Sequence, residues 1–189
     1  KIPTLILTNC FTLSVQEISS ITKKALADAL KQLMAEKPLQ KISVGDICER
    51  CNMNRRSFYY HFRDKYDLVN WVFYTEFAEQ FIGEGQITSG FFLEKICTYF
   101  YRNRAFYVSA LEQEGQNSFS EYFADVMHSL LSLYYTDVVD RDDAYEFIIT
   151  FYTDALLAAL KRWLREGTMP PERFVDLVRR ATNRRAAKV

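Results

Sequence analysis

A stretch near the N-terminus, Lys41–Tyr66, contains two very short helical patterns joined by a polar turn. Ser43 with Asp46 three residues later is a near variant of the capping box, which predicts the start of a helix of about two turns. Asn54 is a suitable N-cap for a second short helix. Helices this short are unstable alone and must be held by neighbours. The segment therefore requires a fold in which other helices pack around it.

The second short helix has two faces of opposite character. Phe58 and Phe62 are four residues apart and share one stripe, whereas Arg56 and Tyr60 fall on a stripe turned away from it, because each residue adds about 100° of rotation. A helix that buries two aromatic rings and exposes polar side chains suits insertion into a DNA groove. This layout is typical of a helix-turn-helix.

The segment Ile42–Leu68 resembles the signature of the tetracycline-repressor (TetR) family of transcriptional regulators. The chain reads I-S-V-G-D-I-C and, after the turn, S-F-Y-Y-H-F-R-D-K-Y-D-L, so several spaced positions agree in one run. The chain departs from the family at Arg56, where Gly is frequent, and at Arg63, where Pro is frequent. Both changes add positive charge on the expected DNA side. The run F-Y-Y-H-F-R-D-K-Y-D-L-V-N-W resembles the branch that regulates dihydroxyacetone-kinase operons.

Seven polar side chains in and beside the second short helix are the candidate DNA contacts: Arg55, Arg56, Ser57, Tyr59, Tyr60, His61 and Lys65. Arginine can bind guanine edges, and the other types can bind phosphates. By the resemblance, Tyr59, His61 and Lys65 match the family's usual phosphate contacts. The two arginines and Tyr60 match its more variable base-facing positions. The alternative is a solvated helix face, for which adjacent tyrosines and a histidine beside two arginines are a poor composition.

The charge distribution supports a DNA partner, although the net charge of the chain is zero. Residues 20–70 hold ten Lys and Arg against six Asp and Glu, whereas residues 71–170 hold seven against fifteen. Residues 171–189 are basic again, with six against two. The basic excess therefore coincides with the helix-turn-helix, and the acidic body would repel phosphate and help orient the molecule on DNA.

Helical patterning and the resemblance together predict an all-α chain of two domains. The helix-turn-helix DNA-binding domain is expected over residues 20–66, with a connecting helix over 67–82. A linker over 83–90 follows, where half of the glycines lie. Residues 91–189 are expected to form a helical bundle for dimerisation and effector binding. Residues 1–19 are expected to form an irregular arm, with a β-prone tail as the alternative.

Individual helices are expected at several places along the chain. The expected ranges are 20–36 before the turn motif and then, after the linker, 91–104, 106–113, 118–138, 142–166 and a last helix beginning at about Pro170. Gly167 is a suitable C-cap for the long helix before it. No internal repeat is evident.

The C-terminal half is rich in tyrosine as well as phenylalanine. Buried tyrosines need partners for their hydroxyls, which a partly polar cavity between helices would supply, although an ordinary core is the default interpretation. The resemblance implies an effector pocket, for which the candidate residues are Tyr99, Phe100, Phe123, Met127 and Tyr152. A protein co-activator in place of a small-molecule effector is the alternative.

The last two helices carry more apolar surface than one small core requires. The resemblance implies that they form a four-helix interface with a second subunit of a homodimer. The candidate interface residues are Phe151, Leu156, Leu160, Trp163, Phe174 and Leu177. Such a dimer would bind a pseudo-palindromic operator with half-sites about 34–36 Å apart, and a repressor is favoured over an activator.

Motifs of other function classes are not found. The sequence has no H-E-x-x-H, nucleotide fingerprint or Walker motif, so neither an enzyme nor a cofactor is expected. Cys48 and Cys51 form a lone C-x-x-C, and since a structural zinc site needs about four ligands, packing is the expected role and no metal is predicted.

Targeting signals are also weak. No run of about 18 apolar residues occurs, so no membrane span is expected. The apolar run Ile2–Phe11 lacks a strong basic region and a small-residue cleavage site, which argues against a signal peptide. Four cysteines do not make a disulfide framework, and this favours a reducing, cytoplasmic location.

Overall fold

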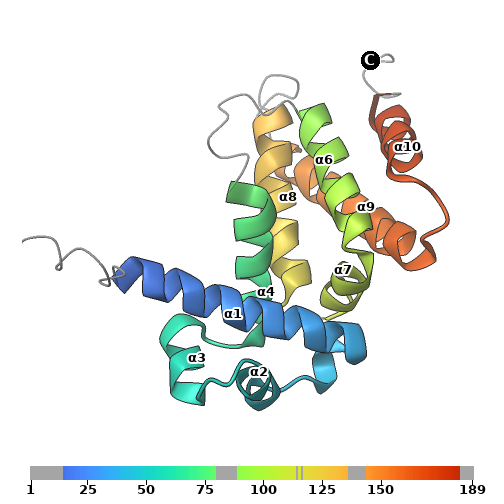
Figure 1. Ribbon diagram of the computed structural model, residues 1–189. Coiled ribbons are helices and arrows are strands. Elements are labelled where there is room, and N and C mark those ends of the chain that lie inside the picture. Colours follow the sequence, from blue (N-terminus) through green and yellow to red (C-terminus); the bar gives the residue numbers. More distant parts are fainter. Residues whose placement is uncertain (1–14, 80–88, 114, 116, 136–143, 184–189) are drawn as a thin grey trace, which may run out of the picture.

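Helices account for the regular structure of the protein, as the sequence predicts (Figure 1). The computed structural model describes residues 15–79, 89–113, 115, 117–135 and 144–183. Within these ranges no strand occurs, and none of the helices is both long and apolar enough to cross a membrane.

The N-terminal unit consists of one long helix followed along the chain by five short helical elements. They are α1 (Val15–Glu36), the 3₁₀ turn η1 (Leu39–Lys41), α2 (Val44–Arg50), α3 (Arg55–His61), α4 (Lys65–Phe73) and the π-helical turn η2 (Tyr74–Ala78). The first helix begins at Val15, before the expected start at residue 20, so part of the expected arm is helical. Glu17 in its first turn favours this start because the N-terminal end of a helix attracts negative charge.

Three side chains cap the N-termini of the short helices, and those of Ser43 and Asn54 do so as predicted. Ser43 Oγ accepts from the Asp46 N–H at 3.1 Å, and the Asp46 carboxylate accepts from the Ser43 N–H at 2.9 Å, which completes a capping box. Asn54 Oδ1 accepts from the backbone N–H of residue 57 at 2.8 Å. Asp64 Oδ1 accepts from the N–H groups of residues 66 and 67, both at 2.8 Å. These caps satisfy N–H groups that have no partner within the helix.

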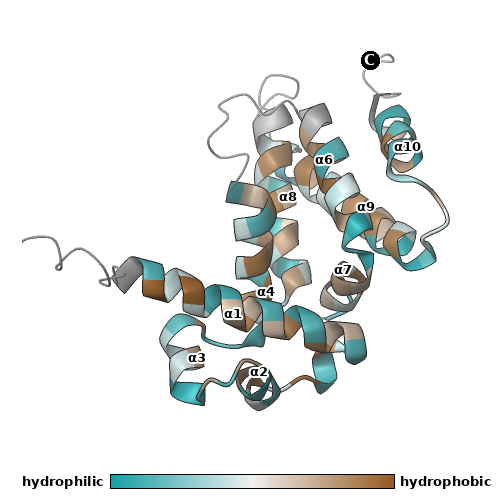
Figure 2. Ribbon diagram, viewed as in Figure 1, coloured by the Kyte–Doolittle hydropathy of each residue, from teal (hydrophilic) through white to brown (hydrophobic). Residues whose placement is uncertain are grey.

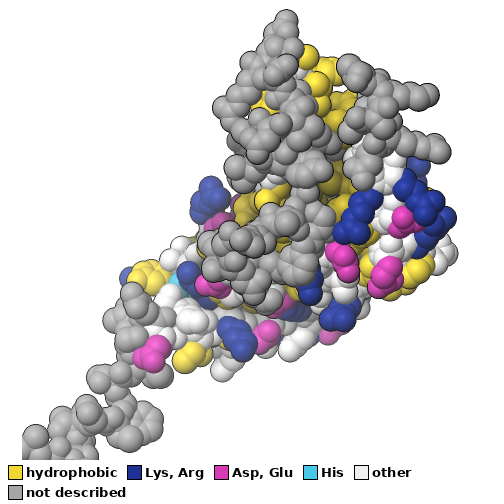
Figure 3. All heavy atoms as spheres, turned by 90° about the horizontal axis from the view of Figure 1, so that it is seen from above, with side chains coloured by type: hydrophobic (Ala, Val, Ile, Leu, Met, Phe, Trp, Pro, Cys, Tyr) yellow, Lys and Arg dark blue, Asp and Glu magenta, His cyan; other side chains and the backbone are white. Residues whose placement is uncertain are grey.

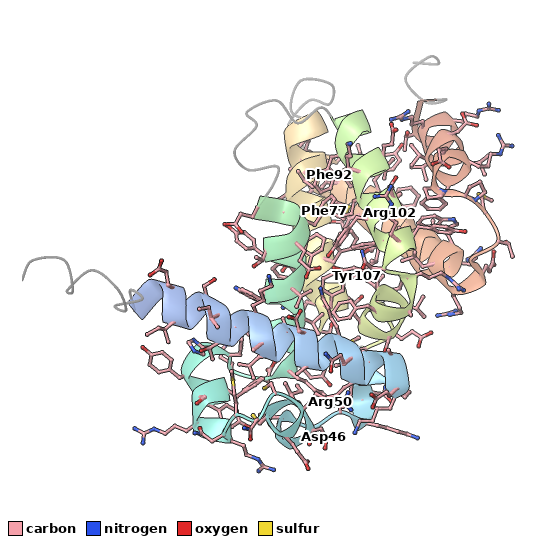
Figure 4. All side chains as sticks on the ribbon, viewed as in Figure 1. Asp46, Arg50, Phe77, Phe92, Arg102 and Tyr107 are labelled. Carbon is pink, nitrogen blue, oxygen red and sulfur yellow. The ribbon has the colours of Figure 1, made fainter. Side chains whose placement is uncertain are left out.

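Two ion pairs hold α2 against the end of α1, and Asp46 and Arg50 lie beneath α1 in Figure 4. Arg50 donates to both oxygens of Glu36 at 2.8 Å. Lys37 Nζ donates to Asp46 Oδ2, also at 2.8 Å. The bond from Lys37, followed by that from Ser43, lowers the pKa of the Asp46 carboxyl to about 2.

The low pKa of Asp46 predicts an acid-sensitive cap. Because the pKa is lower in the folded than in the unfolded chain, this stabilisation is present in full above the ordinary pKa of about 4. It is lost as pH falls through 3.8 toward 2. We expect the thermal midpoint of the Asp46→Asn variant to fall less steeply between pH 4 and 2 than that of the unaltered chain. The matched variant Asp28→Asn, at an exposed position of α1, should keep the original slope.

The C-terminal bundle consists of α6 (Ser89–Arg102), α7 (Arg104–Leu111), α8 (Phe119–Tyr135), α9 (Tyr145–Glu166) and α10 (Pro171–Asn183). The last two residues of the predicted linker over 83–90 belong to α6. Its other residues lie outside the described ranges, as do residues 80–82 of the predicted connecting helix. Gly167 has φ +64°, and its N–H bonds to the Trp163 carbonyl, so the predicted C-cap is confirmed.

The helices form two layers that meet at α1. Figure 1 shows α1 lying across the base of the bundle, with α2 and α3 below it and α4 rising beside α8. Residues of high hydropathy recur along α4 and α8 (Figure 2). The helix α9 packs on α8 and α7, and α10 packs on α6. The N-terminal unit therefore contacts the bundle through two helices, α1, which packs on α7, and α4, which packs on α8.

An aromatic cluster fills the bundle where α4, α6, α7 and α8 meet. Its fully buried members are Phe73, Phe100, Tyr107, Phe119 and Phe123. The rings of Phe100 and Tyr107 stack with centroids 4.1 Å apart, and Phe73 contacts each of the other four. Each such ring stabilises the fold by about 2–3 kcal/mol through burial, so the cluster fixes α4 to the bundle.

Candidate DNA-binding surface

The helix α3 is anchored by one aromatic face and exposes the other. Phe58 and Phe62 are buried, as predicted, and the ring of Phe62 lies 5.8 Å from both Phe58 and Trp71. On the outer face, Tyr59 and Tyr60 are 57% and 77% exposed. Two adjacent aromatic side chains left this exposed by a well-packed helix form a surface suited to a partner molecule.

The two arginines of α3 lie in different places. The Arg55 guanidinium lies against the start of α2, where a Cβ added at Gly45 would meet its Nη2 at 2.7 Å. It borders a shallow groove together with the cap residues Ser43 and Asn54. Arg56 is exposed and has no ion-pair partner among the residues that the structure describes. Of the two arginines, only Arg55 is therefore placed against another helix by its guanidinium contacts within the described residues.

Ser57 and His61 occupy the edges of this face. The Ser57 hydroxyl donates to Asn54 Oδ1 at 3.2 Å, so it supports the helix cap. Burial, and then the positive charge of Lys23, lowers the pKa of the His61 imidazole. His61 is therefore neutral near pH 7, and it can donate a hydrogen bond but brings no charge. Its ring also contacts that of Tyr60, with centroids 4.9 Å apart.

Lys65 is not placed as the sequence predicted. Its ammonium donates to the carbonyls of Leu39 at 2.7 Å, Gln40 at 3.2 Å and Ile42 at 2.7 Å. An ammonium has three donors, so these bonds occupy all of them, and burial lowers the pKa of the group. The expected phosphate contact is thus replaced by a structural one, in which Lys65 holds the carbonyls around η1 to the first turn of α4.

One basic residue near this surface is not evident from the sequence. Lys23 of α1 lies close enough to His61 to lower the pKa of its imidazole. It is therefore beside the end of α3, although the two are far apart in sequence. The only signal was its place on the polar face of a lysine-rich helix, which does not distinguish it from its neighbours.

The two cysteines of the C-x-x-C motif belong to the packing of α2. Cys48 is buried and Cys51 is partly buried, and burial raises the pKa of both thiols. The Cys51 thiol donates to the Ile47 carbonyl at 3.2 Å. Among the described residues, no three His, Cys, Asp or Glu side chains gather as a metal site would require.

The five candidate pocket residues do not line one cavity. Phe100, Phe123 and Met127 are buried in the core, because the aromatic rings pack against one another where a cavity was expected. Tyr99 borders a groove of about 230 Å³ between α1, η2, α6 and α7. Tyr152 borders a different groove of about 340 Å³ between α8, α9 and α10.

The candidate interface residues divide into buried and exposed members. Leu160, Trp163 and Phe174 are 2%, 4% and 7% exposed within the single chain. Trp163 stacks on Phe174 with centroids 4.4 Å apart, and its indole N–H donates to the Met169 carbonyl at 2.8 Å. The expectation that these three lie on a free surface was wrong, since α9 and α10 bury them against each other and α6.

An exposed apolar strip remains on α9. Phe151 is 49% exposed, Leu177 on α10 is 38% exposed, and Leu156 is partly exposed. Phe147 is 72% exposed, and its ring lies 6.3 Å from that of Phe151. In a view from above, hydrophobic side chains gather over the middle of the bundle, with charged side chains of both signs around them (Figure 3).

Two protein-family models match the chain, one over the N-terminal helices and one over the C-terminal bundle. Residues 26–72 match the family of bacterial regulatory proteins named tetR, and residues 89–184 match a transcriptional regulator C-terminal region. A relative from Lactococcus lactis subsp. lactis (strain IL1403), the HTH-type dhaKLM operon transcriptional activator DhaS, is 39% identical over 61 residues. That match covers 32% of this chain and only 33% of the relative.

Two solved structures extend the similarity over most of the chain. The dihydroxyacetone kinase operon activator DhaS superposes with a TM-score of 0.61 at 25% identity, covering 84% of this chain and 94% of that one. A TetR transcriptional regulator from Streptococcus agalactiae 2603V gives a TM-score of 0.66 at 22% identity, covering 86% and 96%. At 22% identity, the similarity to the second structure shows a shared fold and does not extend to function.

Proposed function

Because the chain belongs to the TetR family of transcriptional regulators, we propose that it binds a two-fold symmetric DNA operator as a homodimer. Residues 20–66 form the reading domain in this proposal, residues 67–82 connect it to the bundle, and residues 91–189 form the dimerisation domain. The observation that carries the proposal is the outer face of α3, where Arg56, Tyr59 and Tyr60 are exposed on a helix fixed by its caps and its buried rings.

Within this proposal the residues on α3 take different parts. Arg56 contacts base edges in the major groove, and Tyr60 lies beside it. Tyr59, His61 and Lys23 contact phosphates on either side, since phosphate contacts fix the position of the helix. Lys65 contributes indirectly, by holding η1 to α4.

The exposed strip on α9 supports the homodimer. Phe147 and Phe151 leave large apolar surfaces in water, and the groove beside Phe151 is lined mainly by apolar side chains of α8, α9 and α10. A second copy of α9 and α10 related by two-fold symmetry would cover both features with the same patch.

Selection of bound duplexes from a random-sequence DNA pool tests the proposal. The unaltered chain should recover two inverted half-sites, centred about 34–36 Å apart. The double variant Phe147→Glu and Phe151→Glu should be monomeric by light scattering and recover single half-sites, because a charge on each ring position opposes burial. The matched variant Glu146→Gln, Asp154→Asn changes exposed polar positions of the same helix and should stay dimeric. Recovery of unrelated sequences by the unaltered chain would refute the proposal.

A protein co-activator is the second candidate for the signal that reaches the C-terminal domain. The buried rings of Phe100, Phe119 and Phe123 pack against one another at the position where an effector pocket was expected. In addition, the DhaS relative and the DhaS structure to which the chain is similar are both named as activators. These observations favour a protein partner and activation, in place of the small-molecule effector and repression that the sequence suggested.

A further inference from the structure

A chain of four polar side chains crosses from the N-terminal unit into the bundle. Lys31 of α1 pairs with Glu76 Oε1 of η2. Glu76 Oε2 accepts from the Tyr99 hydroxyl of α6 at 3.0 Å, and the Tyr99 oxygen accepts from the Tyr107 hydroxyl of α7 at 2.9 Å. These four residues are called the interdomain relay below. Figure 4 shows its inner end, Tyr107, between α1 and the core of the bundle.

The inner end of the relay is fully buried and packed. Tyr107 is 0% exposed, and its ring stacks on Phe100. Burial raises the pKa of both tyrosine hydroxyls well above the ordinary value, so both remain protonated donors at neutral pH. The hydrogen bonds therefore run in one direction, from Tyr107 through Tyr99 to the carboxylate. Because the carboxylate also receives the Lys31 ammonium, its two oxygens are tied to opposite domains.

Glu76 occupies a place where the packing pattern calls for an apolar side chain. Val72 and Phe73 of α4 are buried, and positions four residues later are Glu76 and Phe77, of which Phe77 is also buried. The helix changes there to a single π turn, a feature frequent at functional sites. An apolar residue of similar volume would serve stability about as well as a partly buried ion pair. The carboxylate instead fixes one geometry between α1 and the bundle.

We propose that Glu76 and Tyr99 are positioning residues for operator recognition, because they fix the angle at which the reading domain sits on the bundle. The proposal rests on the dimeric operator binding proposed above. In such a dimer the bundle joins the two subunits, so this angle sets the separation and rotation of the two copies of α3. One base pair shifts a half-site by about 3.4 Å and turns it by about 35°, so a fixed angle selects one half-site spacing.

Half-site spacing is the property that tests this role. The operator recovered by selection is rebuilt with its half-sites one or two base pairs closer or farther apart, and a duplex with a single half-site is included. The unaltered chain should lose about tenfold or more in affinity for each base pair of displacement. Glu76→Gln and Tyr99→Phe keep the size of each side chain but weaken the relay. Their affinities should vary by less than about threefold across the same spacings, with single half-site affinity unchanged.

Matched variants separate positioning from general effects. Glu79→Gln alters an exposed carboxylate three residues further along, and Tyr101→Phe removes a tyrosine hydroxyl of α6 that bonds within the bundle, to the Gly167 carbonyl. Both should keep the original spacing dependence. If Glu76→Gln and Tyr99→Phe also keep the original dependence of affinity on half-site spacing, the positioning role is overturned, whether or not they bind more weakly overall. The proposed function would remain intact in that case. An unaltered chain that binds no duplex would instead remove the proposed function. If Tyr99→Phe fails to fold, the partly exposed Glu76 position decides the question alone.

Discussion

Replacing Arg56 with alanine is expected to weaken operator binding by about 10- to 100-fold and to reduce the preference for operator over random DNA. A bidentate contact from arginine to a base edge contributes about 1–3 kcal/mol of discrimination. The side chain is exposed and has no ion-pair partner within the described ranges, so its removal should leave the free energy of unfolding nearly unchanged. Fluorescence anisotropy at one fixed salt concentration, with both DNAs, measures the two affinities.

The control for Arg56 is another exposed arginine outside the reading domain. Arg102→Ala removes the same charge from α6 and should leave both affinities within about threefold of the original. Equal weakening on operator and random DNA by Arg56→Ala would assign the residue to a phosphate. No weakening on either DNA would show that the outer face of α3 is not the DNA-binding surface.

The helix-turn-helix could be predicted in detail because its determinants are local. Ser43, Asn54 and Asp64 each bond to N–H groups two or three residues away. A side chain that acts over one helical turn leaves its signal in the sequence spacing. The burial of Phe58 and Phe62 follows from the same local periodicity.

The packing of the bundle could not be predicted in the same way. Phe73 contacts rings from three other helices, and no spacing rule states which aromatic residues will meet. The excess of tyrosine suggested a polar cavity, yet Tyr107 finds its partner in another tyrosine. Likewise the apolar side chains of α9 and α10 suggested an interface with a second subunit, but Trp163 and Phe174 stack on each other within one chain.

The interdomain relay did leave a signal in the sequence. Glu76 interrupts an apolar stripe that is otherwise continuous from Leu68 to Phe77. A charged side chain at a partly buried position is stabilised by partners that replace the water it loses. The identity of the partners, Lys31 and Tyr99, depends on how α1 and α6 cross the end of α4, which is a property of the tertiary fold.

Replacing Lys65 with methionine is expected to lower the free energy of unfolding by about 2–4 kcal/mol, since three backbone carbonyls lose a charged donor. Leu39 and Ile42, whose carbonyls make two of the bonds, are 0% and 1% exposed, so water replaces the donor poorly. Thermal unfolding should shift downward by on the order of 10 °C for a chain of this size. Lys41→Met, at an exposed position of η1, is the matched control and should shift little.

The salt dependence of DNA binding distinguishes this structural role from a phosphate contact. A lysine on a phosphate contributes about 0.9 to the slope of log affinity against log salt concentration. Since the Lys65 ammonium is occupied by carbonyls, Lys65→Met should keep the slope of the unaltered chain when both are measured well below their unfolding temperatures. The affinity of the Lys65→Met variant for DNA should fall only because the orientation of α4 and η1 is disturbed, and not because a phosphate contact is lost. An unchanged unfolding temperature together with a slope reduced by about one would contradict this and return Lys65 to the DNA surface.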